Sequence, residues 1–448
     1  MYIESLKLTN IRTFVKNQLR FIHPDLEFRS SRLDERRNRR LLPKPRLPNV
    51  TLLLGDNGSG KTTVLQSIAL ASLGPAAPNS KLPLRKFVRY PGEAAKKALS
   101  RQPMEATIVS DLRLHDQDFP PRNSAMPDKV STTTSGVRFQ ARGELELLSD
   151  VNDDGSSKRS PAKLEPTEAE KLWSPVYESQ NEAFFCVAYG ATRRVDSGDS
   201  LERGSTPKSD FLRGQRLQSI FQDSFALFPL AYWLPHLQST NHGRYKQVVG
   251  LLNKLLSPGQ YQFTGELSGQ EYLFERGGMR IPFRSLSDGY RAFIAWVADL
   301  LYHVCYGCTS GKKLIESSGV VLVDEIDLHL HPKWQMKVVS TVAKALPRMQ
   351  FVFTSHSPLV VGSLEWMNIV TLKASAKSNR TVTKRLKQSV HGLDADQILL
   401  TDFFGLQSTM APAKRQQLDE ITARIRSGDK NAPLQLIREM SSGTEVEG

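Results

Sequence analysis

Cysteine is scarce in this chain of 448 residues, which contains only Cys186, Cys305 and Cys308. Three thiols cannot build a disulfide framework, and such sparing use is typical of a reducing compartment, so the sequence predicts a cytoplasmic protein. Cys305 and Cys308 have the spacing of a metal-ligand pair. Because no second pair exists to complete a zinc site, we interpret them as structural thiols.

Long apolar runs are absent as well. No stretch approaches the ~20 residues that a transmembrane helix needs, and the N-terminus lacks the charged start and apolar stretch of a signal peptide. We therefore expect no membrane contact. Residues 215–256 carry aromatic and aliphatic side chains at helical spacing but no sustained heptads, which predicts a helical lobe without a long coiled coil.

Acidic residues are too few to balance the basic ones: 46 Asp and Glu stand against 60 Lys and Arg, and the net charge is +14. This excess favours an anionic partner, with nucleic acid the leading candidate and a solubilising or protein-binding surface the alternative. Eight basic residues fall within residues 29–46. That insertion has no aromatic residue to stack on bases, so it would contact double-stranded DNA through phosphates alone; a solvated loop is an equally good interpretation.

A phosphate-binding loop is the most informative feature that is present. Residues 55–62, GDNGSGKT, match G-x-x-x-x-G-K-[ST], and they lie between a predicted buried strand at 50–54 and a predicted helix at 62–73. In such a loop backbone N–H groups surround a phosphate, Lys61 reaches the β- and γ-phosphates, and the Thr62 hydroxyl is a Mg²⁺ ligand. We therefore expect ATP and Mg²⁺ as cofactors. The predicted nucleotide contacts are Asn57, Gly58, Ser59, Gly60, Lys61, Thr62 and Thr63.

Two further predicted strands end in polar residues suited to hydrolysis. The apolar run 319–323 ends at Asp324 and Glu325. Beside a P-loop, the first acid is placed to hold Mg²⁺ and the second to deprotonate the attacking water. Residues 350–355 predict another buried strand, and His356, which follows it, is placed to reach a γ-phosphate.

The order of these motifs resembles that of an ABC-type ATPase. Residues 286–290, LSDGY, predict a capped helix start, and they resemble the signature LSGGQ of that family. His356 matches the family's switch histidine. The opening YIESLKLTNIRTF resembles the SMC/RecF branch. Within that branch, DEIDLHLHP at 324–332, AYGATRR at 188–194 and GLDADQIL at 392–399 resemble the predicted ATPases of OLD-like and Septu-type anti-phage systems.

The resemblance implies an α/β fold, namely an ABC ATPase head with a P-loop core sheet, an antiparallel β subdomain and an inserted helical lobe. It also implies a head-to-tail pair of copies, in which the P-loop of one copy faces Ser287 and Gly289 of the other across the nucleotide. The expected boundaries are 1–214 and 257–405 for the head, 215–256 for the helical lobe and 406–448 for a helical tail.

The resemblance bears on three other positions. Arg12, at the end of the first predicted strand, would lie near the nucleotide and link DNA contact to hydrolysis, although a surface arginine at a strand end is an equal alternative. His331 stands where transporter ATPases carry an aspartate, so the chemistry of that loop should differ from theirs. The Q-loop glutamine of the family could be Gln140 or Gln180, and both stay open.

Three functions fit such an ATPase. The first is a DNA-linked sensor or regulator in anti-phage defence that acts with a separate effector, a nuclease or a toxin. A separate effector is expected because the chain shows no nuclease motif, and the TOPRIM-like domain of OLD nucleases is missing after the head. The second is a RecF-like ATPase of DNA repair and recombination. The third is a scaffold that sequesters a protein toxin without touching DNA.

Overall fold

The computed structural model describes most of the chain. The described residues are 1–28, 42–80, 82, 87, 89, 106–115, 118, 132–139, 145–149, 176, 183–193, 212–259, 261–307, 312–375 and 380–441. They form two compact units, 1–392 and 393–448. Most of the basic insertion, both candidate Q-loop glutamines and Cys308 lie outside the described residues.

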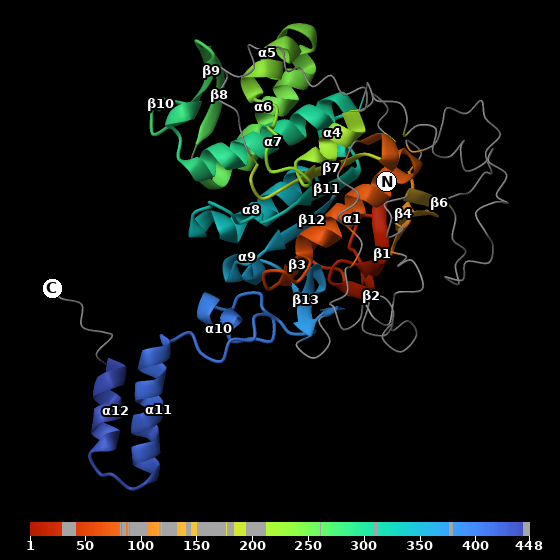
Figure 1. Cartoon of the computed structure of the whole chain (residues 1–448). Helices are drawn as coiled ribbons and strands as arrows, with labels where there is room; N and C mark the ends of the chain where they lie inside the picture. Colours follow the sequence, from red (N-terminus) through yellow and green to blue (C-terminus); the bar gives the residue numbers. More distant parts are fainter. Residues whose placement is uncertain are drawn as a thin grey trace. The chain divides into compact units, whose positions relative to one another are not determined.

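Six strands of the first unit form one sheet in the order β14-β13-β3-β12-β11-β7 (Figure 1). Five of them are parallel, and only β14 runs antiparallel. Every residue of β11 and β12 is buried, as expected of parallel strands covered on both faces. The parallel arrangement brings the carboxyl ends of these strands to one edge. The strands are β3 (Val50–Gly55), β7 (Cys186–Tyr189), β11 (Gly319–Val323), β12 (Met349–Ser355), β13 (Ile369–Ser375) and β14 (Arg380–Lys384).

A second sheet of the first unit is antiparallel and has the order β2-β1-β4-β5-β6. Helix α1 (Lys61–Leu73) has every residue buried except Thr62, and its side chains share one core with both sheets. Such burial on all sides suits a helix without charged residues after Lys61. The strands are β1 (Tyr2–Ile11), β2 (Phe14–Arg20), β4 (Ala106–Arg113), β5 (Thr132–Phe139) and β6 (Leu145–Ser149).

Helices and a small sheet form the rest of the first unit. The long helix α7 (Asp288–Gly307) packs its buried Trp296 on Tyr189 of β7, with ring centroids 5.7 Å apart. Helices α4 (Leu212–Gln218), α5 (Leu230–Thr240) and α6 (His242–Leu256) fall within or next to the predicted helical lobe. The remaining elements are β8 (Gln262–Ser268), β9 (Glu271–Arg276), β10 (Met279–Pro282), α8 (Pro332–Ala345), α9 (Pro358–Gly362) and the 3-10 turns Gly74–Ser80, Ser257–Gly259, Phe283–Ser285, Leu314–Glu316 and Trp366–Asn368.

The predicted fold class is confirmed. The sheet that carries the P-loop, the antiparallel sheet and the helices between them are the parts expected of an α/β ATPase head. Helix α6, the longest of α4 to α6, has 15 residues, so the described part of the lobe contains no long coiled coil. No described helix combines the length and the apolar character needed to cross a membrane.

The second unit contains α10 (Ala395–Leu399) and a pair of contacting helices, α11 (Pro412–Arg426) and α12 (Ala432–Ser441). An ion pair between Lys414 and Glu439 joins the two helices, and another joins Arg424 of α11 to Asp429 of the connecting turn. Exposed ion pairs contribute little individually, so the stability of the pair also depends on its few buried residues, such as Ile421.

Candidate functional site

The P-loop connects the end of β3 to the start of α1. Gly58 and Gly60 adopt the left-handed region, with φ of 75° and 97°, which side chains disfavour. A Cβ on Gly60 would lie only 2.7 Å from Phe14 Cε2 and from Thr13 Oγ1, so no other residue fits there without displacing both. The Ser59 hydroxyl is buried without a hydrogen-bond partner among the described residues. The loop therefore has the open backbone of a phosphate cradle and an unsatisfied polar group inside it.

Lys61 lies folded against this loop and is only 7% exposed. Its Nζ donates to the carbonyl oxygens of Gly55, at 2.7 Å, and of Asp56, at 3.0 Å. Burial lowers the pKa of Lys61, whereas the surrounding carboxylates, that of Asp324 first, raise it. The buried ammonium thus faces an acidic group that lies close to the loop.

Asp324 is held by hydroxyl groups from two other elements. The Thr62 Oγ1, at the start of α1, donates to Asp324 Oδ2 at 2.6 Å. The Thr354 Oγ1, near the end of β12, donates to Asp324 Oδ1 at 2.5 Å. Asp324 is 5% exposed. A carboxylate and a hydroxyl in contact beside a phosphate cradle are donors that suit Mg²⁺.

Glu325 and His356 lie at the same edge of the sheet, because β11 and β12 pair in parallel. Glu325 has a φ of 47°, which is uncommon for a residue with a side chain. Its N–H donates to Thr354 Oγ1 at 2.7 Å, so one threonine hydroxyl orients both acids. His356 follows β12 directly and is half-buried. The structure therefore places Lys61, Asp324, Glu325 and His356 at one edge of the sheet.

Arg12 lies behind the P-loop, against the first turns of α1. Its guanidinium donates to Thr63 Oγ1 at 3.2 Å and to Gln66 Oε1 at 2.9 Å, and it stacks over the ring of Phe87. Burial lowers the pKa of Arg12. The predicted contact residue Thr63 therefore connects Arg12 to the helix that begins at Lys61.

The signature residues lie beside the loop that follows the acids. Ser287 is exposed, and the backbone of Gly289 approaches the His329 carbonyl so closely that a Cβ would lie 2.2 Å from its oxygen. His331 caps α8, since its Nδ1 accepts from the Lys333 N–H. Within the described part of the chain, no backbone hydrogen bond joins Ser287 or Gly289 to the P-loop, and the small pocket that these two residues line includes no P-loop residue.

The sequence did not predict a role for Arg193, which the structure places at the site. The loop after β7 carries it to the acids, where its NH2 group donates to the main-chain oxygens of Glu325, at 2.5 Å, and of Asp324, at 3.3 Å. The apolar run 185–189, with Thr192 and Arg193 shortly after it, could have indicated another buried strand, although not the strand with which it pairs.

Comparison with known proteins places these motifs in one family. Residues 50–362 match a family model described as "AAA domain, putative AbiEii toxin, Type IV TA system". The Septu protein PtuA of Bacillus mycoides (strain KBAB4) is 24% identical over 80% of this chain and 41% of its own length. A retron Vc95 probable ATPase of Vibrio cholerae is 40% identical over 19% of this chain and 17% of its own length. The chain thus spans less than half of these relatives.

Solved structures of SMC heads are also similar to this chain. The SMC head bound to the C-terminal winged-helix domain of ScpA has a TM-score of 0.49, with 13% identity over 86% of this chain and 99% of that one. The SMC head of Thermotoga maritima has a TM-score of 0.43 and 12% identity, over 87% of this chain and 100% of that one. Since the family model covers most of the chain, the protein belongs to the AAA-domain family described as "putative AbiEii toxin, Type IV TA system".

Proposed function

We propose that the protein binds and hydrolyses ATP, as an ABC-type ATPase that regulates an anti-phage defence system. The observation that supports this most is the 2.6 Å hydrogen bond between Thr62, at the end of the P-loop, and Asp324, next to Glu325. It joins two motifs that are 262 residues apart in the sequence. A phosphate cradle beside paired acids is the arrangement that phosphoryl transfer from a nucleotide to water requires.

Each residue of the site has a role in this proposal. The P-loop backbone and Lys61 bind the phosphates of ATP. Thr62 and Asp324 would hold Mg²⁺, which neutralises phosphate charge when it is bound. Glu325 accepts a proton from the attacking water, whose oxygen forms a bond to the γ-phosphorus as the bond to ADP breaks. His356 donates a hydrogen bond to the transferred phosphate.

The complete site requires a second copy of the chain in this proposal. Ser287 is exposed, and among the described residues it makes no backbone hydrogen bond to the P-loop of its own chain. An exposed serine just before the N-terminus of the 20-residue helix α7 is suited to bind a phosphate presented by another molecule. ATP would therefore lie between the P-loop of one copy and Ser287 and Gly289 of the other.

Thr354→Val tests the hydroxyl that orients both acids. Valine keeps the shape of the side chain but leaves the Asp324 Oδ1 and the Glu325 N–H without this partner. We expect the free energy of unfolding to fall by about 1–3 kcal/mol and the hydrolysis rate to fall by about 10- to 100-fold. Thr371→Val removes a buried hydroxyl that bonds the Lys384 carbonyl instead, and it should leave the rate unchanged. Equal rates in the two variants would exclude this role for Thr354.

The defence role rests on the relatives. The chain resembles Septu and retron ATPases, and its family is described by a toxin–antitoxin system. We propose that the ATPase acts with a separate effector, a nuclease or a toxin, and that double-stranded DNA regulates it. The net charge of +14 supports a polyanionic regulator.

Phosphate release measured with and without double-stranded DNA tests this regulation. We expect DNA to stimulate hydrolysis at low salt and the stimulation to disappear as salt rises, because phosphate contacts release counterions. Changing the four arginines of residues 36–40 to serine should weaken the stimulation, whereas changing Arg415 and Arg426 of α11 should not. Hydrolysis that is indifferent to DNA at every salt concentration would instead favour a switch that responds to a protein partner.

A further inference from the structure

Arg193 occupies a strained and buried position next to the acids. It lies in the loop after β7, the strand that pairs with β11, and it is 6% exposed. Its backbone adopts a φ of 36°, in a region that residues with side chains rarely enter and that costs of order 1–3 kcal/mol. Such strain persists only where surrounding contacts enforce it, and it is concentrated at functional sites.

The contacts of Arg193 are made to the backbone of the catalytic turn. Its NH2 group donates to the main-chain oxygens of both Asp324 and Glu325. The N–H of Asp324 donates to the Tyr189 carbonyl, at the end of β7, at 2.9 Å. The β7 side therefore holds this turn at three backbone atoms.

Thr354 holds the same turn from the β12 side. The Glu325 N–H is bound by Thr354 and the Glu325 carbonyl by Arg193, so the peptide groups on both sides of the Glu325 Cα are fixed. The φ of Glu325 is itself 47°. A turn in this conformation, held on both sides, determines where the Glu325 carboxylate points.

The charge of Arg193 also suits this place. Burial is the main influence on Arg193, and the acids of the 324–327 turn oppose it only in part, so the pKa of Arg193 is lowered to about 10. The guanidinium therefore stays positive at neutral pH. Asp327 Oδ1 is buried there without a hydrogen-bond partner among the described residues. Arg193 and Lys61 are cations that face this cluster of carboxylates.

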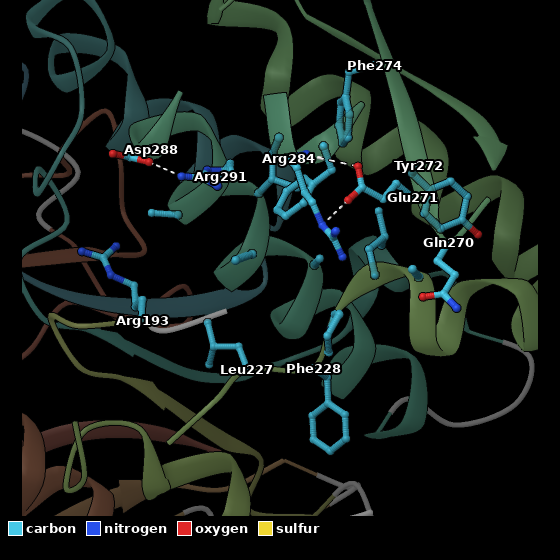
Figure 2. A pocket seen from close by; sticks show the side chains of 18 of the residues that line it. Arg193, Leu227, Phe228, Gln270, Glu271, Tyr272, Phe274, Arg284, Asp288 and Arg291 are labelled. Atoms are coloured by element: carbon cyan, nitrogen blue, oxygen red, sulfur yellow. Dashed lines mark hydrogen bonds and ion pairs between the residues drawn. The ribbon is translucent and has the colours of Figure 1, made fainter. Parts of the chain in front are cut away.

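On its other side Arg193 lines a cavity of about 460 Å³ between α7, β9 and residues 227–231. Figure 2 shows Arg193 on the same side of the cavity as the ion pair of Asp288 and Arg291, which belongs to the signature helix. The pair of Arg284 and Glu271 lies farther along the cavity. A small cation could therefore approach the Arg193 position through the cavity.

We propose that Arg193 is a positioning residue for ATP hydrolysis, which fixes the turn at Asp324 and Glu325 and so aims the Glu325 carboxylate at the attacking water. This inference rests on the proposed ATPase function. In this proposal Arg193 contributes to the chemical step without contacting ATP directly. Arg193 should accordingly affect kcat and leave nucleotide affinity largely unchanged.

Arg193→Ala tests this role through a separation of kcat from binding. We expect kcat to fall by about 10²-fold, the effect of a small misplacement of a reacting group. The dissociation constant of a fluorescent ATP analogue should change by less than about threefold, which is less than the tenfold change that about 1.4 kcal/mol of binding free energy would cause. Guanidinium chloride at low concentration should restore part of kcat by entering the cavity. Arg193→Lys, which keeps the charge but loses the planar fork, should have an intermediate kcat.

The control is Arg284→Ala, which removes another arginine of the same cavity that is paired with Glu271. Its kcat should stay within about twofold of the wild type, and guanidinium should not change it. In a Glu325→Gln background, Arg193→Ala should cause no further loss in single-turnover rate, because both changes act through one group.

Three results would overturn the inference. They are a wild-type kcat in Arg193→Ala or Arg193→Lys, a loss in affinity as large as the loss in kcat, and a full additional loss in the Glu325→Gln background. A wild-type chain that releases no phosphate at all would contradict the proposed ATPase function instead, so the two failures are distinguishable. If Arg193→Ala does not fold, the comparison of Arg193→Lys with Arg284→Ala decides.

Discussion

Glu325→Gln is expected to stop hydrolysis while leaving ATP bound. Glutamine keeps the size of the side chain and can still contact water, but it cannot accept the proton that the attacking water must lose. General-base catalysis contributes about 10²- to 10⁴-fold, so we expect kcat to fall by that factor. The affinity for ATP should be unchanged, because the P-loop and Lys61 are intact. Single-turnover phosphate release and equilibrium binding measure the two quantities separately.

The same variant should accumulate as an ATP-bound dimer. If ATP lies between the P-loop of one copy and Ser287 of the other, a chain that binds but cannot hydrolyse ATP stays paired. Size-exclusion chromatography with light scattering, with and without ATP, gives the mass. Glu266→Gln changes an exposed acid on β8 that pairs with Arg280, and it should behave as the wild type does. Hydrolysis by Glu325→Gln at the wild-type rate would show that another group is the base.

Lys61→Ala is expected to weaken ATP binding by about 10²-fold. A hydrogen bond between charged groups contributes about 1.5–3 kcal/mol, and each 1.4 kcal/mol corresponds to a factor of ten in affinity. Hydrolysis should be lost with binding. Titration of a fluorescent ATP analogue measures the effect, and Lys337→Ala, which removes an exposed lysine of α8, provides the control.

The stability of Lys61→Ala should separate a lost contact from a damaged fold. Burial lowers the pKa of Lys61 below the value for an unfolded chain, so the unfolded state binds its proton more tightly. The charge of Lys61 therefore costs stability at neutral pH, and this cost offsets part of what Lys61→Ala loses with the two hydrogen bonds to the Gly55 and Asp56 carbonyls, so we expect only a small fall in melting temperature. ATP affinity close to that of the wild type would contradict the role of Lys61, and a large fall in melting temperature would show that the loss of affinity follows from a damaged fold.

The sequence predicts the parts of this site that are local. The P-loop, the acids after β11 and His356 after β12 each follow a buried strand directly, and parallel strands end at one edge of a sheet. The roles of Arg193 and Thr354 could not be predicted in this way. Arg193 reaches the acids because β7 pairs with β11, whose sequence lies far away, and no local pattern reports that pairing.

The predictions that rest on charge are less specific than those that rest on the motifs. The basic insertion suggested DNA contact, but residues 29–41 and the candidates Gln140 and Gln180 lie outside the described part of the chain, so these remain predictions. Arg12 was expected either near the nucleotide or as a surface arginine at a strand end. The structure places it on Thr63 and Gln66 of α1, and its contact with ATP stays a prediction.

The central claim is that ATP is hydrolysed at a site completed by two copies of the chain. Phosphate release by the purified wild-type protein, measured as the rate per subunit over a dilution series with Mg²⁺ and ATP, tests it most directly. The account predicts a rate per subunit that rises with protein concentration to a plateau, because the P-loop must meet Ser287 of another copy. Release that is absent at every concentration, or a rate per subunit that stays constant as the protein becomes monomeric, would contradict it.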